Sequence, residues 1–487
     1  MLYNNPIPTK IMTPDTVETR LGTLKFVDGV PTAETTQLVF DNLDFMRGTE
    51  VFLNFVPACS IEAIRLSFIE RGAGKSNQAI LFADLCDSNP LLLTANTDTV
   101  YCIGLLDLEA DGPTVVEIPP HCGPGTVNDA FFRFVVDMGA PGPDRGAGGK
   151  YLIVPDWYQG ELPKDKREGG DYFIARSPSK INVLILRGFL VDGKPDASSQ
   201  MFRTGLKIYP LAAAANPPQM EFGNVSRVPF NTIHANDFEF YEELDHVVQR
   251  EPLELFDPEL LGLAAAIGIK KGQKFAPDAR MRKILTDAVA VGNATARAIT
   301  FRNRDPRAPL YPNSQWQTGF IGDDYRWLDG DGMGGRNHDA RTRFFYMATV
   351  NTPAMALKMV GVGSQYAIIA ADKDGGDLHG ARTYRLNIPA NAPAKDFWSV
   401  VVYDPQTRSE LQTCQPFPSK NSQRDQLIAN ADGSVDLYIG PQAPAGKEAN
   451  WIATVRGKGW FALFRLYGPL EPWFDGSWKP GEITMVK

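Results

Sequence analysis

The chain has 487 residues, a formal net charge of −8 and a sequence pI near 5.4. Nucleic-acid binding needs a clustered basic face, and the one short candidate, residues 164 to 167, is interrupted by Asp165, so we expect no nucleic-acid partner. Single cores stop growing at roughly 250–300 residues, which predicts more than one domain here. The apolar share of 43% and charged share of 22% are typical of globular proteins.

Neither a membrane span nor a leader peptide is predicted. The sequence has no uninterrupted apolar stretch of about 18 residues, the length a spanning helix requires. Residues 1 to 6 lack the basic and apolar regions of a signal peptide. We therefore expect a cytoplasmic location for the sequence as given, or a periplasmic or secreted one if a leader was removed.

No metal or cofactor motif is present. The histidines show no HxH or HExxH spacing, and the acidic loop that begins at Asp372 has Thr383 where a calcium loop needs glutamate. The glycines of residues 72 to 76 lack the leading glycine and strand of a phosphate loop. We expect no cofactor and no stoichiometric zinc. The cysteines, which form no CxxC pair, are predicted to be buried free thiols: Cys59, Cys86, Cys102, Cys122 and Cys414.

The first half of the chain reads as an arm, a helical hairpin and a β domain. Residues 1–80 are predicted to hold an extended N-terminal arm and two helices separated at Pro57. Residues 81–232 contain six or seven short β-branched runs bounded by turn residues, which favours a β-sandwich over parallel β-α-β winding. One of these runs includes Asn96–Tyr101, so we expect Asn96 and Asp98 on one strand face.

Helical spacing then dominates until the last quarter. Residues 233–360 are predicted to form an α-helical middle domain with a helix over 278–302, a loop-like stretch over 310–336 and a last helix over 341–360. Residues 361–487 alternate with period two between Asp-Gly, Asp-Pro and Gly-Pro turns, which predicts an antiparallel sandwich. The expected fold class is mainly β with an α-helical middle.

Several strings together resemble a known two-part bacterial family. Asn96–Tyr101 (NTDTVY), Leu106–Leu108 (LDL) and Gly149–Pro155 (GKYLIVP) resemble domain of unknown function 1254. The strings that resemble its usual C-terminal partner, domain of unknown function 1214, are Leu378–Gly380 with Tyr384, Phe397–Tyr403 (FWSVVVY), Asp432–Ser434 (DGS), Glu448–Trp451 (EANW), Arg465–Tyr467 (RLY) and Pro472–Trp478 (PWFDGSW). The resemblance implies an immunoglobulin-like sandwich, a helical insert and a C-terminal jelly-roll sandwich. It implies no particular activity.

Asp98 is the main candidate for a catalytic role. It stands in an otherwise apolar region, where an ionised carboxylate is costly unless it is paired or hydrogen-bonded. With Tyr101, and with Arg187 or Arg341 as a cationic partner, it could serve as a general base. The structural alternative is that its oxygens accept hydrogen bonds that hold a strand end.

Other polar and aromatic residues are candidates for substrate binding. Aromatic rings with polar tips can line a ligand cavity, and the histidines beside charged residues can act on a substrate. The predicted substrate-binding residues are Asn96, Trp316, Tyr325, His338, Asp374 and His379. For the histidines and the acidic loop, a structural or surface role is the alternative.

These observations favour a small-molecule or carbohydrate-related enzyme or binder with its site where the two sandwiches meet. If the protein is an enzyme, we expect a hydrolase that uses a carboxylate general base. The alternative is a non-catalytic structural or interaction protein, and in either case we expect a homo-oligomer. A deep cavity with convergent Asp, Tyr and Arg would favour an enzyme, and a flat apolar patch would favour the alternative.

Overall fold

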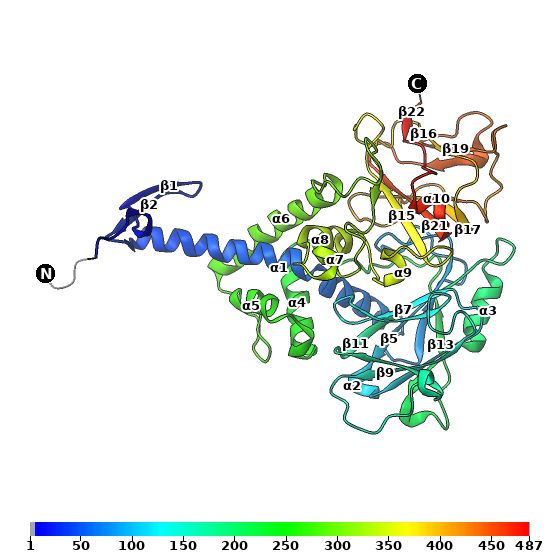
Figure 1. The fold of residues 1–487 in the computed structure, drawn as a ribbon, viewed down its shortest axis with the longest axis horizontal. Helices are drawn as coiled ribbons and strands as arrows, with labels where there is room; N and C mark the ends of the chain where they lie inside the picture. The colour runs from blue at the N-terminus through cyan, green and yellow to red at the C-terminus, as the bar shows by residue number, and fades with distance from the viewer. Residues whose placement is uncertain (1–4, 487) are drawn as a thin grey trace.

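The computed structural model describes residues 5–486 and begins with a small sheet that continues into a long helix. The sheet is antiparallel, with β1 (Thr16–Thr19), β2 (Gly22–Val27) and β3 (Val30–Pro31), where the sequence predicted an extended arm. A short 3-10 helix, Thr9–Ile11, precedes it. Figure 1 shows that this sheet and the first turns of α1 (Ala33–Glu70) project from the rest of the molecule.

The predicted helical hairpin is wrong, because α1 is one continuous helix of 38 residues that contains Pro57. Proline inside a helix costs about 3 kcal/mol. Here the turns on both sides of Pro57 are enclosed, with Phe55 and Ile61 fully buried, and this packing outweighs the lost hydrogen bond. By length and composition α1 could cross a membrane, but 72% of its most apolar window is buried inside the protein. Its apolar character therefore serves the core.

Helices surround the buried half of α1. They are α4 (Glu239–Arg250), α5 (Pro258–Ala266), α6 (Ala279–Phe301) and α8 (His338–Met347), with the short α7 (Asp329–Gly332) and α9 (Pro353–Ala356) and the 3-10 helix Leu253–Leu255. α6 confirms the helix predicted over 278–302. The helix predicted over 341–360 is wrong beyond Met347, because Ala348 is extended and Val350 has a φ of 66°, a left-handed conformation that ends the helix.

Two glycines let α1 and α6 approach closely. A β-carbon on Gly48 would lie 2.8 Å from Leu285 Cδ2 and 2.9 Å from Ala288 Cβ, and one on Gly292 would lie 2.9 Å from Phe52 Cδ1. Side chains at these positions would push the two helices apart. The close crossing therefore depends on glycine.

We expect Gly48→Ala to destabilise the protein by about 1–3 kcal/mol, because overpacking outweighs the gain in helix propensity. Gly262→Ala is the matched control, since Gly262 is exposed on α5 and a β-carbon there would have no other atom within 4 Å. Gly262→Ala should raise the free energy of unfolding by about 0.5–1 kcal/mol. Urea unfolding of both variants measures the difference, and equal effects would contradict the close-packing argument.

The first β domain consists of two sheets. Their strand orders are β10-β9-β6-β12 and β13-β4-β5-β11-β7-β8. The pairs β9–β10 and β4–β13 are parallel, and the other pairs are antiparallel. The strands are β4 (Gln78–Leu81), β5 (Val100–Asp107), β6 (Thr114–Ile118), β7 (Pro124–Asn128), β8 (Phe134–Gly139), β9 (Gly149–Pro155), β10 (Tyr172–Ser177), β11 (Ile181–Gly188), β12 (Lys207–Pro210) and β13 (Glu221–Asn224), with helices α2 (Leu108–Asp111) and α3 (Asp196–Gly205) and 3-10 turns Lys166–Glu168 and Leu211–Ala213.

The six-stranded sheet is buried on both faces. On β11, Leu184 and Leu186 pack toward the four-stranded sheet, whereas Val183 and Ile185 pack toward the helices around α1. Side chains alternate along a strand, so one strand contributes to both cores. The face toward the helices is also the face that reaches the C-terminal β domain.

The C-terminal β domain also has two sheets, with strand orders β14-β15-β21-β17-β18 and β20-β19-β16-β22. All pairs are antiparallel except β19–β20. The strands are β14 (Gln317–Thr318), β15 (Ser364–Ile369), β16 (Tyr384–Ile388), β17 (Ala394–Tyr403), β18 (Ser419–Asn421), β19 (Val435–Gly440), β20 (Trp451–Ala453), β21 (Phe461–Pro469) and β22 (Thr484–Met485), with α10 (Glu471–Phe474) and the 3-10 turn Glu448–Asn450. The predicted fold class of β-sandwiches with an α-helical part is confirmed, while the immunoglobulin-like and jelly-roll topologies stay predictions.

Candidate functional site between the two β domains

A cavity lies where the six-stranded sheet meets the five-stranded sheet of the C-terminal β domain. It encloses about 860 Å³ of space between protein atoms, its mouth included. We call it the interdomain cavity. Most of its lining is apolar: Ile64, Phe68, Leu92, Leu93, Ala95, Ile103, Val183, Ile185, Phe344, Met347, Ala348, Val350, Met355, Ile368 and Leu463. Its polar lining side chains are Thr94, Asn96, Tyr101, Arg187, Thr349, Tyr366 and Arg465.

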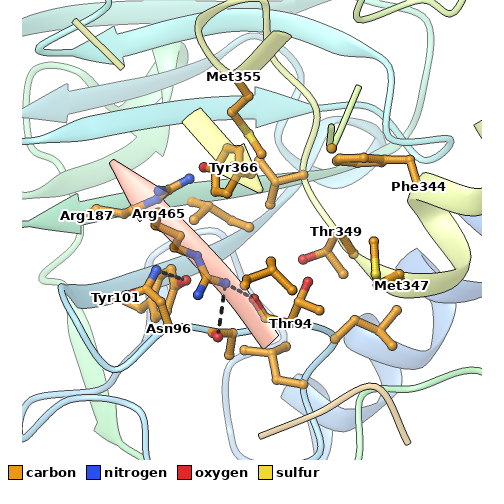
Figure 2. Close-up of a pocket in the computed structure, with 18 of the residues that line it drawn as sticks. Thr94, Asn96, Tyr101, Arg187, Phe344, Met347, Thr349, Met355, Tyr366 and Arg465 are labelled. Atoms are coloured by element: carbon orange, nitrogen blue, oxygen red, sulfur yellow. Dashed lines mark hydrogen bonds between the residues drawn. The ribbon is translucent and has the colours of Figure 1, made fainter. Parts of the chain in front are cut away.

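Two arginines enter this apolar cavity from facing strands, Arg187 from β11 and Arg465 from β21. Arg465 Nη2 donates to the carbonyl of Thr94 at 2.8 Å, while its buried Nη1 has no hydrogen-bond partner among residues 5–486. Neither guanidinium forms an ion pair with a carboxylate in that range, and no Asp or Glu of that range lines the cavity. Figure 2 shows both arginines beside Tyr366, with Phe344 and Met347 on the other side.

Tyr101 and Asn96 form a fixed polar pair in this cavity. Asn96 Nδ2 donates to the hydroxyl of Tyr101, and Asn96 Oδ1 accepts from the backbone nitrogens of Asp98 at 2.9 Å and Thr99 at 3.1 Å. Burial raises the pKa of Tyr101 to about 12, although Arg187 and Arg465 act in the opposite direction. The hydroxyl is therefore protonated at neutral pH and can donate its proton to a ligand.

Two family models match the chain, and each covers one side of the cavity. "Protein of unknown function (DUF1254)" matches residues 76–210, and "Protein of unknown function (DUF1214)" matches residues 363–471. The chain belongs to this two-part family. The DUF1254 segment supplies Asn96, Tyr101 and Arg187, and the DUF1214 segment supplies Tyr366 and Arg465. The cavity is thus shared by both domains of the DUF1254–DUF1214 chain.

Two solved structures are similar to this chain over most of its length. The crystal structure of the VPA0106 protein from Vibrio parahaemolyticus has a TM-score of 0.55 at 17% identity and covers 92% of this chain and 100% of its own. The crystal structure of an uncharacterized protein from Burkholderia cenocepacia has a TM-score of 0.41 at 13% identity, covering 93% and 97%. Comparison with curated proteins finds no match. The first of these structures supports the fold alone.

Asp98 lies next to the interdomain cavity but does not line it. The strand predicted through Asn96 is wrong, because residues 96–99 form a turn held by Asn96 Oδ1 and β5 begins at Val100. The carboxylate is fully buried and accepts from Ser399 Oγ at 2.5 Å, Asn421 Nδ2 at 3.0 Å and Tyr467 OH at 3.3 Å. These donors all belong to the C-terminal β domain, so Asp98 joins the two β domains.

The remaining predicted residues lie in other places. Arg341, Tyr325 and His338 line a separate cavity beside α8. Trp316 is core of the C-terminal β domain, with its Nε1 donating to the Gly481 carbonyl at 2.9 Å. Asp374 and His379 are exposed on the connection between β15 and β16. The predicted set therefore does not form one site.

The sequence reasoning missed Arg465, Tyr366 and Thr94. Arg465 stands in the apolar run Phe461–Tyr467, so the cost of burying its charge was a usable signal. Tyr366 and Thr94 carry no such signal, because a tyrosine and a threonine in strand-like runs are ordinary. Their convergence depends on how the two domains pack.

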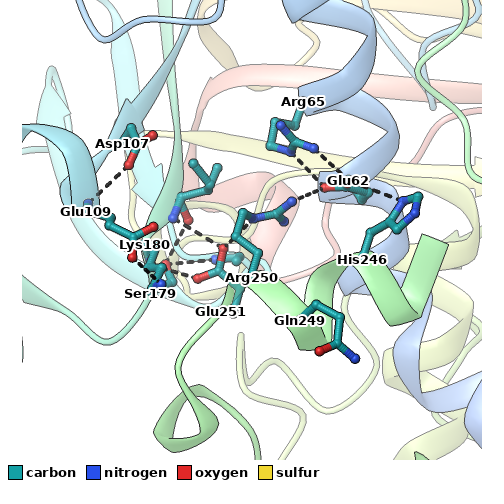
Figure 3. Close-up of polar contacts among 12 residues, drawn as sticks. Glu62, Arg65, Asp107, Glu109, Ser179, Lys180, His246, Gln249, Arg250 and Glu251 are labelled. Carbon is teal, nitrogen blue, oxygen red and sulfur yellow. Dashed lines mark hydrogen bonds and ion pairs between the residues drawn. The ribbon is translucent and has the colours of Figure 1, made fainter. Parts of the chain in front are cut away.

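A second polar cluster joins the helices to the first β domain. Glu62 on α1 accepts from Arg65 Nε at 2.8 Å and from Arg250 Nη1 at 2.7 Å, and Glu251 accepts from the backbone nitrogen of Lys180 at 2.7 Å. Figure 3 shows these contacts running from α1 through the end of α4 to the turn before β11. Both carboxylates have cationic or backbone partners, and neither lines a described cavity. This cluster serves structure.

Two further observations bear on metal and thiol chemistry. Among residues 5–486 no group of three His, Cys, Asp or Glu side chains is placed to hold a metal ion. The five cysteines are free thiols, four buried and Cys414 exposed. Burial raises the pKa of Cys59, Cys86, Cys102 and Cys122, which keeps these thiols protonated and unreactive.

Proposed function

We propose that this protein binds a small organic anion with an apolar body in the interdomain cavity. The observation that carries the proposal is the pair Arg187 and Arg465, two guanidinium groups in a mostly apolar cavity that form no ion pair with a carboxylate among residues 5–486. A buried cation is costly unless it meets an anion or several acceptors. A ligand carboxylate would supply that partner, and Tyr101 would donate a further hydrogen bond.

The lining favours an apolar acid over a carbohydrate within the small-molecule class. Sugars need many hydrogen-bonding groups, whereas this cavity is mostly enclosed by aliphatic, methionine and phenylalanine side chains. If the bound molecule reacts, Tyr101 is the group placed to hold or donate a proton, and Asp98 acts only through its neighbours.

The matched ligands octanoate and 1-octanol test the role of charge. We expect octanoate to bind at least about tenfold more tightly than 1-octanol, because only the carboxylate meets the two arginines. Arg187→Met should reduce that preference, because only Arg465 then remains to meet the carboxylate. The control is Arg176→Met, since Arg176 is exposed on β10, away from the cavity. Isothermal titration calorimetry measures all six combinations of protein and ligand, and equal affinities for acid and alcohol in the unchanged protein would contradict the proposal.

Self-association is the second candidate, favoured by the projecting N-terminal sheet and helix. Val27, Val30 and Phe40 are exposed there by 70%, 66% and 54%. Exposed apolar side chains that gather on one segment are typical of contact surfaces. Such a contact is compatible with ligand binding, because β1 and β2 lie far from β11 and β21, which line the interdomain cavity (Figure 1).

A further inference from the structure

A second cavity lies on the other side of α8. It encloses about 1500 Å³ of space between protein atoms, its open side included. We call it the α8 cavity. Helix α8 separates it from the interdomain cavity, since Phe344 lines the interdomain cavity and Phe345 lines the α8 cavity. The two are therefore distinct places for a ligand.

Three side chains that line the α8 cavity have buried polar atoms without a partner. Arg341 Nε, Trp327 Nε1 and Asn351 Oδ1 make no hydrogen bond within residues 5–486, and each of these side chains is more than nine-tenths buried. A buried donor or acceptor that lacks a partner destabilises the fold. Two donors and one acceptor on side chains that line one cavity leave hydrogen-bonding capacity that a polar ligand group or ordered water can use.

Positive charge gathers at the same place. Arg336, just before α8, and Arg341, in its first turn, form no ion pair with a carboxylate in the described part of the chain. Arg336 donates to the Arg326 carbonyl at 2.7 Å, and Arg341 donates to the side-chain amide oxygen of Asn54. Burial and the charge of Arg336 lower the pKa of Arg341 to about 10. The positive end of the α8 dipole adds to this potential.

The acidic residues of this cavity form no ion pair with the two arginines, although the charge of Asp257 acts on both. Asp257 and Glu259 are exposed at its rim, and the Asp257 carboxylate accepts from the Glu259 backbone nitrogen at 2.9 Å as the cap of α5. Neither forms an ion pair with Arg336 or Arg341. The deeper walls are aromatic and include Tyr325, Trp327 and Phe256. A ligand that suits this cavity is therefore anionic at one end and aromatic elsewhere.

We propose that the α8 cavity binds an aromatic carboxylic acid, with its carboxylate between Arg336 and Arg341 and its ring against Tyr325 and Trp327. Arginine pairs planar carboxylates through two parallel hydrogen bonds, and aromatic rings stack on or against one another at favourable distances. This site is independent of the interdomain cavity and does not rest on the function proposed for it.

The test uses 2-naphthoate as the probe and 2-naphthalenemethanol as its uncharged match. Titration by calorimetry in the Arg187→Met background weakens anion binding in the interdomain cavity, and the further loss in Arg336→Met then reports on the α8 cavity. There we expect the acid to bind at least about tenfold more tightly than the alcohol, and Arg336→Met to abolish that difference. Arg336 is exposed, so this change leaves the core intact. Quenching of tryptophan fluorescence gives a second readout because Trp327 lines the cavity.

Arg326→Met is the matched control. Arg326 lines the same cavity but forms an ion pair with Asp324 at 3.1 Å. Arg326→Met therefore removes the same charge as Arg336→Met but takes away no guanidinium group that is available to a ligand. We expect it to keep the preference for the acid. Three results would overturn the proposal: no binding of 2-naphthoate, equal binding of acid and alcohol, or equal losses in Arg336→Met and Arg326→Met. Absence of binding would mean that ordered water alone satisfies the three buried atoms.

Discussion

Asp98→Ala is expected to lower the free energy of unfolding by about 3–5 kcal/mol, the range for removing one partner from a buried charged network. The change leaves Ser399, Asn421 and Tyr467 with buried donors that face an empty space. Because those donors belong to the C-terminal β domain, we expect the contact between the two β domains to weaken first. Urea unfolding and limited proteolysis between the domains measure this.

The more conservative substitution Asp98→Asn distinguishes a structural role of Asp98 from a role in ligand binding. It keeps the side-chain volume and should cost about 1–3 kcal/mol, while the folded protein keeps its affinity for octanoate because Asp98 does not line the cavity. Asp374→Asn is the control, since Asp374 is exposed and should change stability by less than about 0.5 kcal/mol. Loss of binding in Asp98→Asn without loss of stability would instead assign Asp98 to the site.

The importance of Asp98 was predictable from sequence, but its partners were not. A carboxylate in an apolar stretch must be compensated, and that argument needs only local sequence. The donors on Ser399, Asn421 and Tyr467 lie about 300 positions later and meet Asp98 only because two β domains pack together. For the same reason the predicted partners Arg187 and Arg341 fall into separate cavities, and Arg465 is the arginine whose charge acts on Asp98.

The spacing of apolar residues predicted helices well where no other signal in the sequence competed with it. α6 (Ala279–Phe301) has one apolar face and a clear cap at Asp278, and its predicted bounds agree closely with the structure. α1 combines helical spacing with Pro57, and local rules end a helix there. The second half of α1 is buried on all sides, and this packing keeps the helix continuous through Pro57. Such burial depends on the assembled fold and cannot be read from the local sequence.

Glu62→Gln is expected to lower the free energy of unfolding by about 3–5 kcal/mol at neutral pH, because it leaves the guanidinium groups of Arg65 and Arg250 partly buried without their shared charge. Glu62 is fully enclosed, whereas the two arginines are 19% and 18% exposed. Arg250 keeps its contact with Glu251 at 3.0 Å, so the loss falls mainly on Arg65. The urea midpoint measures the change.

The pH dependence of that loss identifies its electrostatic origin. Burial alone would raise the pKa of Glu62, but the hydrogen bonds and charges of Arg65 and Arg250 lower it below its ordinary value. A carboxyl with a lowered folded pKa stabilises the fold above its unfolded pKa of about 4.3 and loses this contribution as the pH falls through the folded value. The stability difference between Glu62→Gln and the unchanged protein should therefore persist above about pH 5 and shrink as the pH falls through the folded pKa.

Glu109→Gln is the control for this pH experiment. Glu109 pairs with Lys180 in the same cluster but is 60% exposed, so its loss should cost less than about 1 kcal/mol. Glu251, whose pKa is raised by burial, is present in all three proteins and cancels from the differences. The stability difference between Glu62→Gln and the unchanged protein could instead stay constant as the solution is acidified. That result would mean that lost packing, and not the loss of the buried ion pairs of Glu62, causes the destabilisation.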